Sequence, residues 1–257
     1  MKNFCGAKRV VGWAIAPLLI APGCLLTGLA STSLAENIQD LRHFLIAKEC
    51  IGCDLEGSVL RGMELTGVRL EQSNLRGAML QETVLIGGNL QGADLSGANL
   101  EEASLARANL SGAILQDTQL SGASIASADF GLADLQRANL SGAIAFETSF
   151  TRANLTEANL SEASLIQANF GQAVLNFANF EQANLQQAYL IRADLSNANF
   201  KNANLAGARL VRANLDGVDL SEANLADAKL DRATFEGAIF CRTTMPDRRQ
   251  NNRDCSD

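Results

Sequence analysis

Ala98-Asn99-Leu100 is the stretch that decides the fold, because a small residue followed two places later by a large apolar one recurs every five residues. The pattern runs without insertion or deletion through 38 consecutive units, from residue 53 to residue 242. We call the large apolar residue of each unit the centre. It is Leu in 29 units and Phe in seven, with Ile125 and Ala145 as the exceptions. Such an uninterrupted repeat predicts one elongated domain.

A period of five is neither the helical nor the strand period, so it needs its own explanation. In an extended segment, residues two apart point the same way. The small residue and the centre therefore face inward, and the residue between them faces out. The chain must turn after each unit to keep this phase, which predicts a four-sided coil of 20 residues. Coils stacked about 4.8 Å apart would form an all-β rod of about 45 Å, with about nine to ten coils.

Residues 20 apart in such a rod should stack directly on one another. Buried Leu and Phe centres, each worth about 1.5–3 kcal/mol, would supply the main stabilisation. Two columns should add stacking contacts and amide hydrogen bonds. The inner column is Phe130, Phe150 and Phe170, and the outer column is Asn99, Gln119, Asn139, Asn159, Asn179 and Asn199.

Residues 1–35 have the composition of a secretory signal peptide. A basic start is followed by an apolar run over residues 10–30 and by small residues before a predicted cleavage site after Ala35. We expect no stable membrane anchor after cleavage. An uncleaved anchor is the competing interpretation, because the apolar run is long enough to span a bilayer.

The segments that flank the repeat are predicted to close its two ends. Residues 36–52 should form a capping helix, and the polar residues 243–257 a C-terminal capping tail after Pro246 interrupts the pattern. In the helix, the apolar side is expected to be Ile38, Leu41, Leu45 and Ile46, with Asn37 and Asp40 as a capping pair. His43 is expected at the surface.

Four cysteines remain after the predicted cleavage: Cys50, Cys53, Cys241 and Cys255. An even number in an exported protein suggests disulfides. We favour Cys50–Cys53 and Cys241–Cys255, because each pair is local and lies at one end of the repeat. A redox-active Cys50-x-x-Cys53 would require a strand-to-helix context, and the spacing of Cys241 and Cys255 is too wide for a standard zinc knuckle.

The Ala-Asn/Asp-Leu-x-x units of residues 53–242 resemble the pentapeptide-repeat family. This resemblance implies a right-handed quadrilateral β-helix and supplies no catalytic residues. The flanks Cys50–Leu55 and Phe240–Asp247 resemble the ends of exported cyanobacterial members. They imply a protein of the periplasm or the thylakoid lumen.

Composition argues against several classes of function. The mature chain would carry 18 basic and 28 acidic residues, a net charge of −10, which disfavours nucleic-acid binding. One histidine, no nucleophile elbow, no phosphate loop and no metal cluster within the repeat predict that the protein is not an enzyme and uses no cofactor.

Sorting the outward residues by side of the coil gives four unequal faces. Two adjacent acidic faces, centred on Leu55 through Phe235 and on Leu60 through Phe240, have net charges of −7 and −4. The basic face, centred on Leu70 through Leu230, has a net charge of +4. Its second half carries a cluster that we call the basic strip: Arg192, Arg209, Arg212, Lys229 and Arg232. Stacked like charges are unfavourable, so either acids such as Asp231 compensate or an anionic partner binds.

The fourth face, centred on Leu65 through Leu225, is nearly uncharged, and we call it the quiet face. It carries an outward apolar column of Ile86, Ala106, Ala126, Phe146 and Ile166, with Ile144 beside it. A contiguous apolar stripe predicts a contact surface, for a protein partner or for a second copy. The alternative is that Phe146 covers the space left by Ala145.

These features predict an exported, non-enzymatic scaffold that offers flat faces to an unidentified protein partner or to a homodimer. The alternative is an acidic DNA mimic, since some family members protect gyrase in this way. The two acidic faces fit that function loosely. Export argues against it, because gyrase is cytosolic.

Overall fold

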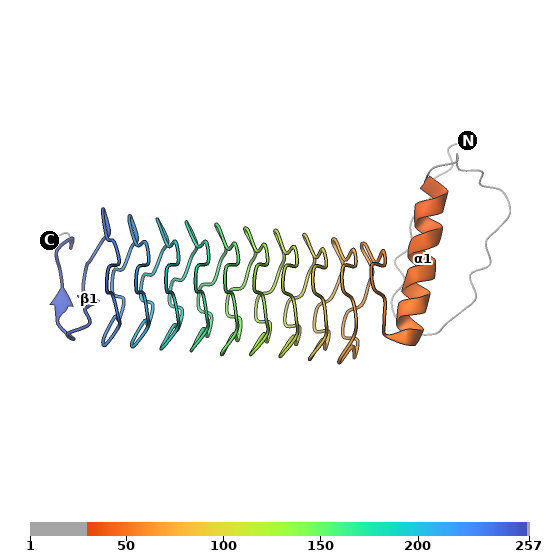
Figure 1. The fold of residues 1–257 in the computed structure, drawn as a ribbon, viewed down its shortest axis with the longest axis horizontal. Helices are drawn as coiled ribbons and strands as arrows, with labels where there is room; N and C mark the ends of the chain where they lie inside the picture. The colour runs from red at the N-terminus through yellow and green to blue at the C-terminus, as the bar shows by residue number, and fades with distance from the viewer. Residues whose placement is uncertain (1–29, 256–257) are drawn as a thin grey trace, which may run out of the picture.

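The computed structural model describes residues 30–255 and shows a rod with one helix lying across its N-terminal end (Figure 1). The helix α1 spans Ala30–Ala47, and two short strands, β1 (Thr243–Thr244) and β2 (Gln250–Asn251), lie at the opposite end. The part of the predicted signal peptide before Ala30 lies outside the described residues, and its cleavage stays a prediction. No helix among residues 30–255 is long and apolar enough to cross a membrane.

The body of the rod is a β-helix held by 36 single-residue parallel bridges. Each bridge joins a residue to the one 20 positions later, from Glu49–Arg69 to Asn224–Thr244. The bridging residue is the one just before each centre, and a turn follows every centre. Each side of the coil is therefore too short to form a regular strand, although the 20-residue coil predicted by the repeat is present.

The interior consists of the centres and of the small residues two places before them. Centres from Leu55 to Leu225 are at most 1% exposed. The last residue of a unit has a φ near +60°, for Gly97 (64°) as for Glu162 (59°) and Arg212 (60°). Glycine is the natural residue for this conformation, and at other units a residue with a side chain accepts about 1–2 kcal/mol of strain.

The side chain of the outward Asn or Asp before a centre accepts a hydrogen bond from a backbone N–H in the turn that follows the centre. Asp94 Oδ1 accepts a hydrogen bond from the Ser96 N–H (3.0 Å), two residues later. The amide of Asn159 also donates to Asn139 Oδ1 in the preceding coil (3.2 Å). This ladder is confirmed from Gln119 through Asn199. Asn99 instead donates to Glu101.

The inner aromatic column is also confirmed. Phe130 and Phe150 stack with ring centroids 5.3 Å apart, and Phe150 and Phe170 stack at 4.9 Å. Phe180 joins this column edge-on to Phe170 (5.9 Å) and stacks on Phe200 (4.6 Å). The aromatic packing therefore extends across two sides of the coil.

The N-terminal helix differs from the prediction in its bounds and in its buried side. Phe44 is fully buried, and Leu41 packs against the same core. Leu45 and Ile46 are 45% and 86% exposed, and Ile38 is 46% exposed, so the predicted apolar side is wrong. The helix crosses the end of the coil (Figure 1) and packs against it through Phe44 and Leu41.

Asp40 does not cap this helix, because α1 already begins at Ala30. Its Oδ2 accepts the Asp54 N–H (2.9 Å). One coil later, the equivalent Asn74 N–H donates to Cys53 O in the preceding coil (2.8 Å). Asp40 therefore accepts the hydrogen bond that a backbone carbonyl of a preceding coil accepts elsewhere in the rod. Cys50, 2% exposed, occupies a centre position, so the register begins one unit earlier than predicted.

The C-terminal register continues one unit past the predicted end at Arg242. Thr243 is buried and donates to Leu220 O (2.7 Å), and Thr244 bridges Asn224. The tail then returns, with β2 antiparallel to β1.

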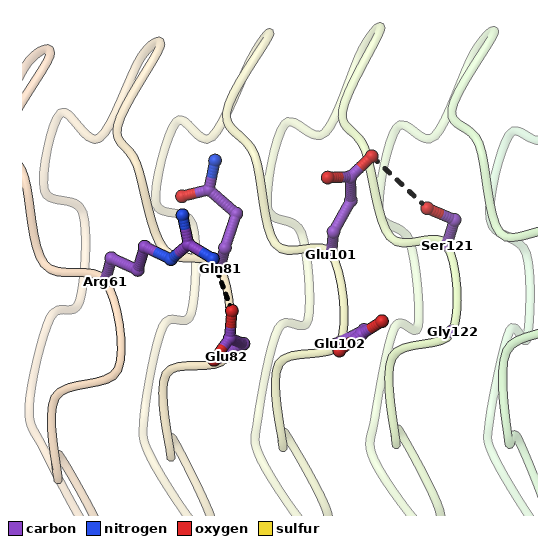
Figure 2. A pocket seen from close by; sticks show the side chains of 7 residues that line it. All are labelled: Arg61, Gln81, Glu82, Glu101, Glu102, Ser121 and Gly122. Carbon is purple, nitrogen blue, oxygen red and sulfur yellow. Dashed lines mark hydrogen bonds and ion pairs between the residues drawn. The ribbon is translucent and has the colours of Figure 1, made fainter.

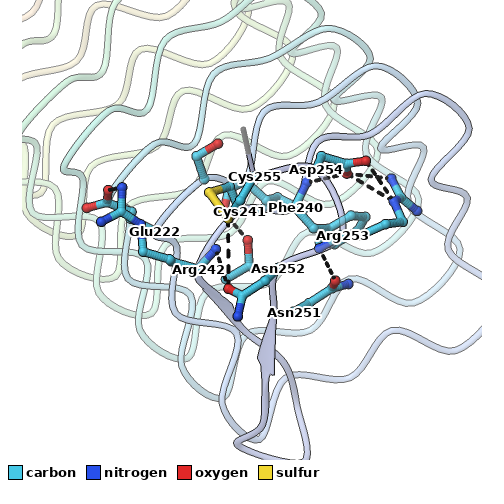
Figure 3. The surroundings of a disulfide bond; sticks show 12 residues. Glu222, Phe240, Cys241, Arg242, Asn251, Asn252, Arg253, Asp254 and Cys255 are labelled. Carbon is cyan, nitrogen blue, oxygen red and sulfur yellow. Dashed lines mark hydrogen bonds and ion pairs between the residues drawn. A yellow bond between two sulfur atoms is a disulfide. The ribbon is translucent and has the colours of Figure 1, made fainter. Parts of the chain in front are cut away.

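This tail crosses the end of the last coil and binds its unpaired backbone groups (Figure 3). Asp254 Oδ2 accepts the Phe240 N–H (2.8 Å), and Asn252 Oδ1 accepts the Arg242 N–H (3.1 Å). The neighbouring Arg253 guanidinium, followed by the Phe240 N–H, holds the pKa of the Asp254 carboxyl below its usual value. Asp254 thus has at this end the role that Asp40 has at the other.

The structure joins Cys50 to Cys53 and Cys241 to Cys255. The two pairs lie at opposite ends of the rod, so the four cysteines cannot share one zinc ion (Figure 1). Cys50 is buried as a centre, whereas Cys53 is partly exposed.

Candidate interaction surfaces

Ion pairs between neighbouring coils involve five of the sixteen acidic residues on the two acidic faces. Asp94 binds Arg76 (3.0 Å), and Lys201 binds Asp219 (3.1 Å). Further pairs are Arg137–Asp117 and Arg242–Glu222. Partial burial opposes ionisation of Asp94, but hydrogen bonds from Ser96 and Arg76 outweigh it and lower its pKa. Each pair uses one acid and one base of the same face, so the net charges of the two faces stay at −7 and −4.

A shallow groove of about 450 Å³ lies on the acidic side of the N-terminal half (Figure 2). It lies where Ser121 and Gly122 are small and the three preceding coils carry larger side chains. Those side chains are Arg61, Gln81, Glu82, Glu101 and Glu102. Arg61 pairs with Glu82, and this hydrogen bond raises the pKa of Arg61. No group of three or more His, Cys, Asp or Glu within residues 30–255 is arranged to hold a metal ion.

The basic strip is assembled from three consecutive coils. Arg209 and Lys229 form a backbone bridge, and the Arg192 and Arg212 N–H groups donate to the coils that follow them. All five side chains of the strip are exposed. The ten ion pairs formed by the described residues include none of the five and do not include Asp231. Asp231 therefore forms no direct ion pair with the strip, and whether acids compensate its charge stays a prediction.

Tyr189 belongs to this surface and was missed by sequence reasoning. It precedes Arg209 by one coil, and the Arg209 guanidinium carbon lies 5.6 Å from its ring centroid. Its position 20 residues before Arg209 was the available signal. The Tyr189 ring makes a cation–π contact with the Arg209 guanidinium. This contact does not use the N–H donors of Arg209, which stay able to bind an anion.

The apolar column of the quiet face is brought together as predicted. Backbone hydrogen bonds link its coils, from Gly87 N to Ala106 O (2.9 Å) through Glu147 N to Ile166 O (3.0 Å). Ile86 is 38%, Ile144 52% and Phe146 39% exposed, whereas Ile166 is half-buried. This column is a continuous apolar ridge across five coils.

The family follows from the repeat itself. A pattern described as pentapeptide repeats matches the chain in eight overlapping copies: residues 53–92, 64–102, 89–125, 103–142, 133–172, 153–190, 173–210 and 208–245. The chain belongs to the pentapeptide-repeat family. Members of this family fold as right-handed β-helices and are generally non-enzymatic structural or interaction proteins.

The solved structure of HetL agrees with this assignment. The chain is 30% identical to HetL, a pentapeptide repeat protein involved in heterocyst differentiation regulation in the cyanobacterium Nostoc sp. strain PCC 7120. That likeness covers 82% of this chain and 97% of HetL, with a TM-score of 0.62. A pentapeptide repeat protein of the Arabidopsis thaliana thylakoid lumen is 36% identical over 38% of this chain and 64% of its own, with a TM-score of 0.29. Among curated protein sequences, none matches the chain.

In this pentapeptide-repeat protein, the family pattern accounts for the buried residues and the turns. The basic strip and the apolar column use outward positions that the pattern leaves free. They are therefore the places where this member can differ from others in what it binds.

Proposed function

We propose that this pentapeptide-repeat protein is an exported, non-enzymatic scaffold that binds an acidic protein partner along the basic strip. The observation that carries the proposal is a cluster of five exposed cations on three consecutive coils, none of which forms an ion pair with another residue of 30–255. Members of the family are generally structural or interaction proteins, which is compatible with a binding role.

The electrostatics of the strip favour an anionic partner. Successive coils lie about 4.8 Å apart, so the stacked guanidinium groups of Arg192, Arg212 and Arg232 repel one another. A partner that places carboxylates along the same line would relieve this repulsion and form charge-assisted hydrogen bonds. The rod is rigid, so little ordering entropy would oppose binding.

Export is supported by the leader and by the cysteines. Residues 1–35 combine a basic start, an apolar run and small residues before Ala35, as secretory signals do. One disulfide at each end of a rod of about nine to ten coils fits an oxidising compartment such as the periplasm or the thylakoid lumen. The alternative, an acidic DNA mimic, is favoured by the net charges of −7 and −4 on the acidic faces, but export argues against it because gyrase is cytosolic.

Replacement of Arg212 by Glu should weaken binding of an acidic polypeptide about tenfold, because it reverses the central charge of the strip. Poly-glutamate is a suitable probe, titrated into residues 36–257 at low and at high salt. Affinity of the unsubstituted protein should fall as salt rises.

The matched control is Arg42→Glu, which makes the same charge change on α1 at the other end of the rod. It should leave the affinity unchanged. Equal affinity of the Arg212→Glu and unsubstituted proteins, or binding that ignores salt, would remove the basis for the proposed partner.

A further inference from the structure

The quiet face carries only two charged residues between residues 65 and 222, namely Arg107 and Glu147. Both are exposed last residues of their units, with φ of 60° and 54°. Neither belongs to an ion pair formed by the described residues. They lie one coil to either side of Ser127, as the hydrogen bonds from Arg107 N to Ala126 O and from Ser127 N to Phe146 O show. Opposite charges thus flank Ser127 at equal distances of about 4.8 Å along the rod.

The apolar column has the same centre. Ala126 lies next to Ser127, with the small Ala106 one coil before it and the large Phe146 one coil after it. Ile86 and Ile166 lie two coils away on the two sides. Reversing the direction of this column therefore sets a small residue opposite a large one and an isoleucine opposite an isoleucine.

We propose that the quiet face binds a second copy of this chain, antiparallel to the first, about a two-fold axis at the coil of Ser127. Such an axis lies in the interface and is perpendicular to the rod. Each column then faces the same column of the second copy in reverse order, which is the isologous contact of a two-fold dimer. Ser127 and Ala126 lie on the axis and face themselves.

This arrangement pairs both charged residues and the apolar column of the quiet face with the second copy. Arg107 faces Glu147 of the second copy, and the symmetry repeats the contact, so both unpaired charges acquire partners. The Phe146 ring packs over Ala106 of the second copy, and Ile86 packs against Ile166. The exposed apolar ridge of each rod is covered.

A parallel dimer would not place opposite charges across from one another. Each coil would then face the same coil of the second copy, which brings Arg107 toward Arg107 and Glu147 toward Glu147. Like charges across an interface suppress that pairing, so the charge pattern selects the antiparallel dimer. The ridge covers five coils, or about 24 Å, so we expect a small interface and a weak dimer with micromolar affinity.

The dimer goes beyond the proposed function and does not depend on it. The basic strip lies on the neighbouring face, and Arg212 and Arg232 belong to coils beyond the overlap of the two rods. Loss of one kind of binding would therefore leave the other intact.

Sedimentation equilibrium of residues 36–257 at about 10–500 μM should show a monomer–dimer equilibrium, as expected for a small interface. Arg107→Glu and Glu147→Arg should each weaken dimerisation about tenfold, because each turns two attractive contacts into two repulsive ones. The double variant Arg107→Glu/Glu147→Arg should restore it, and Arg212→Glu should leave it unchanged. A monomer throughout this range overturns the proposal, as does a dimer that ignores both single variants or a double variant that stays monomeric.

A cross-linking measurement tests the axis independently of the charges. A short bismaleimide should join two copies of Ser127→Cys efficiently, because that residue faces itself across the axis. Gln167→Cys lies two coils away in the same column, faces Gly87 of the second copy, and should not cross-link. The native cysteines are already joined in pairs and do not compete. Equal cross-linking of the two variants would contradict the axis at Ser127.

Discussion

Replacement of Leu155 by Asp is expected to abolish the folding of the middle coils. Leu155 is a fully buried centre, so the substitution removes about 2–5 kcal/mol of apolar packing and leaves an unpaired carboxyl group in the core. The sum is comparable with the whole stability of about 5–15 kcal/mol of a typical domain. Thermal unfolding followed by circular dichroism should lose its cooperative transition, and protease should cleave near the substitution.

The matched control is Asn154→Asp, one residue earlier. Position 154 faces outward, and the same column carries Asp134 in the preceding coil and Asp194 two coils later. This control should unfold within about 0.5 kcal/mol of the unsubstituted protein. A cooperative transition for Leu155→Asp at the original temperature would mean that the centre column does not hold the rod.

Replacement of Cys255 by Ser should release the tail from the last coil. The lost disulfide closes a loop with a sequence separation of 14, worth about 3 kcal/mol in the chain-entropy account. Because contacts in a repeat protein are between neighbours, the effect should be local. Amide hydrogen exchange should accelerate in residues 220–245, where Phe235 and Phe240 pack, and stay slow in the middle of the rod.

Cys53→Ser provides the reciprocal control at the other end. It should accelerate exchange only in the first coil and at the contact of α1 with it. If Cys255→Ser left exchange in residues 220–245 unchanged, the tail would not be acting as a cap.

The middle of the rod could be predicted from sequence because every unit meets the same surroundings. Asn159 contacts the coil before it and the coil after it just as Asn139 does, so one argument about the pentapeptide covers all of them. The interior Phe130–Phe150–Phe170 stack followed from the 20-residue coil for the same reason.

The ends could not be predicted in this way, because each end is unique. The choice of Phe44 as the buried residue of α1 depends on the angle at which the helix crosses the coil. Asp40 and Asp254 bind backbone groups that become unpaired only because no further coil follows. A repeat pattern contains no information on either contact.

The interaction surfaces could be predicted from sequence only in part. Their columns follow from the repeat, and the structure places the basic strip and the apolar ridge where the 20-residue coil predicts. The ion pairs do not follow, because pairs such as Arg61–Glu82 and Arg76–Asp94 run diagonally between coils and depend on side-chain conformation. Among the described residues, none of these pairs includes a residue of the basic strip.

The most direct test of an exported scaffold is to locate the protein in fractionated cells and to determine its mass. The account predicts a chain that begins at Glu36, lies in the periplasm or the thylakoid lumen, and contains no free thiol because all four remaining cysteines are paired. A full-length chain with reduced cysteines in the cytosol would contradict the account and would favour an acidic mimic instead.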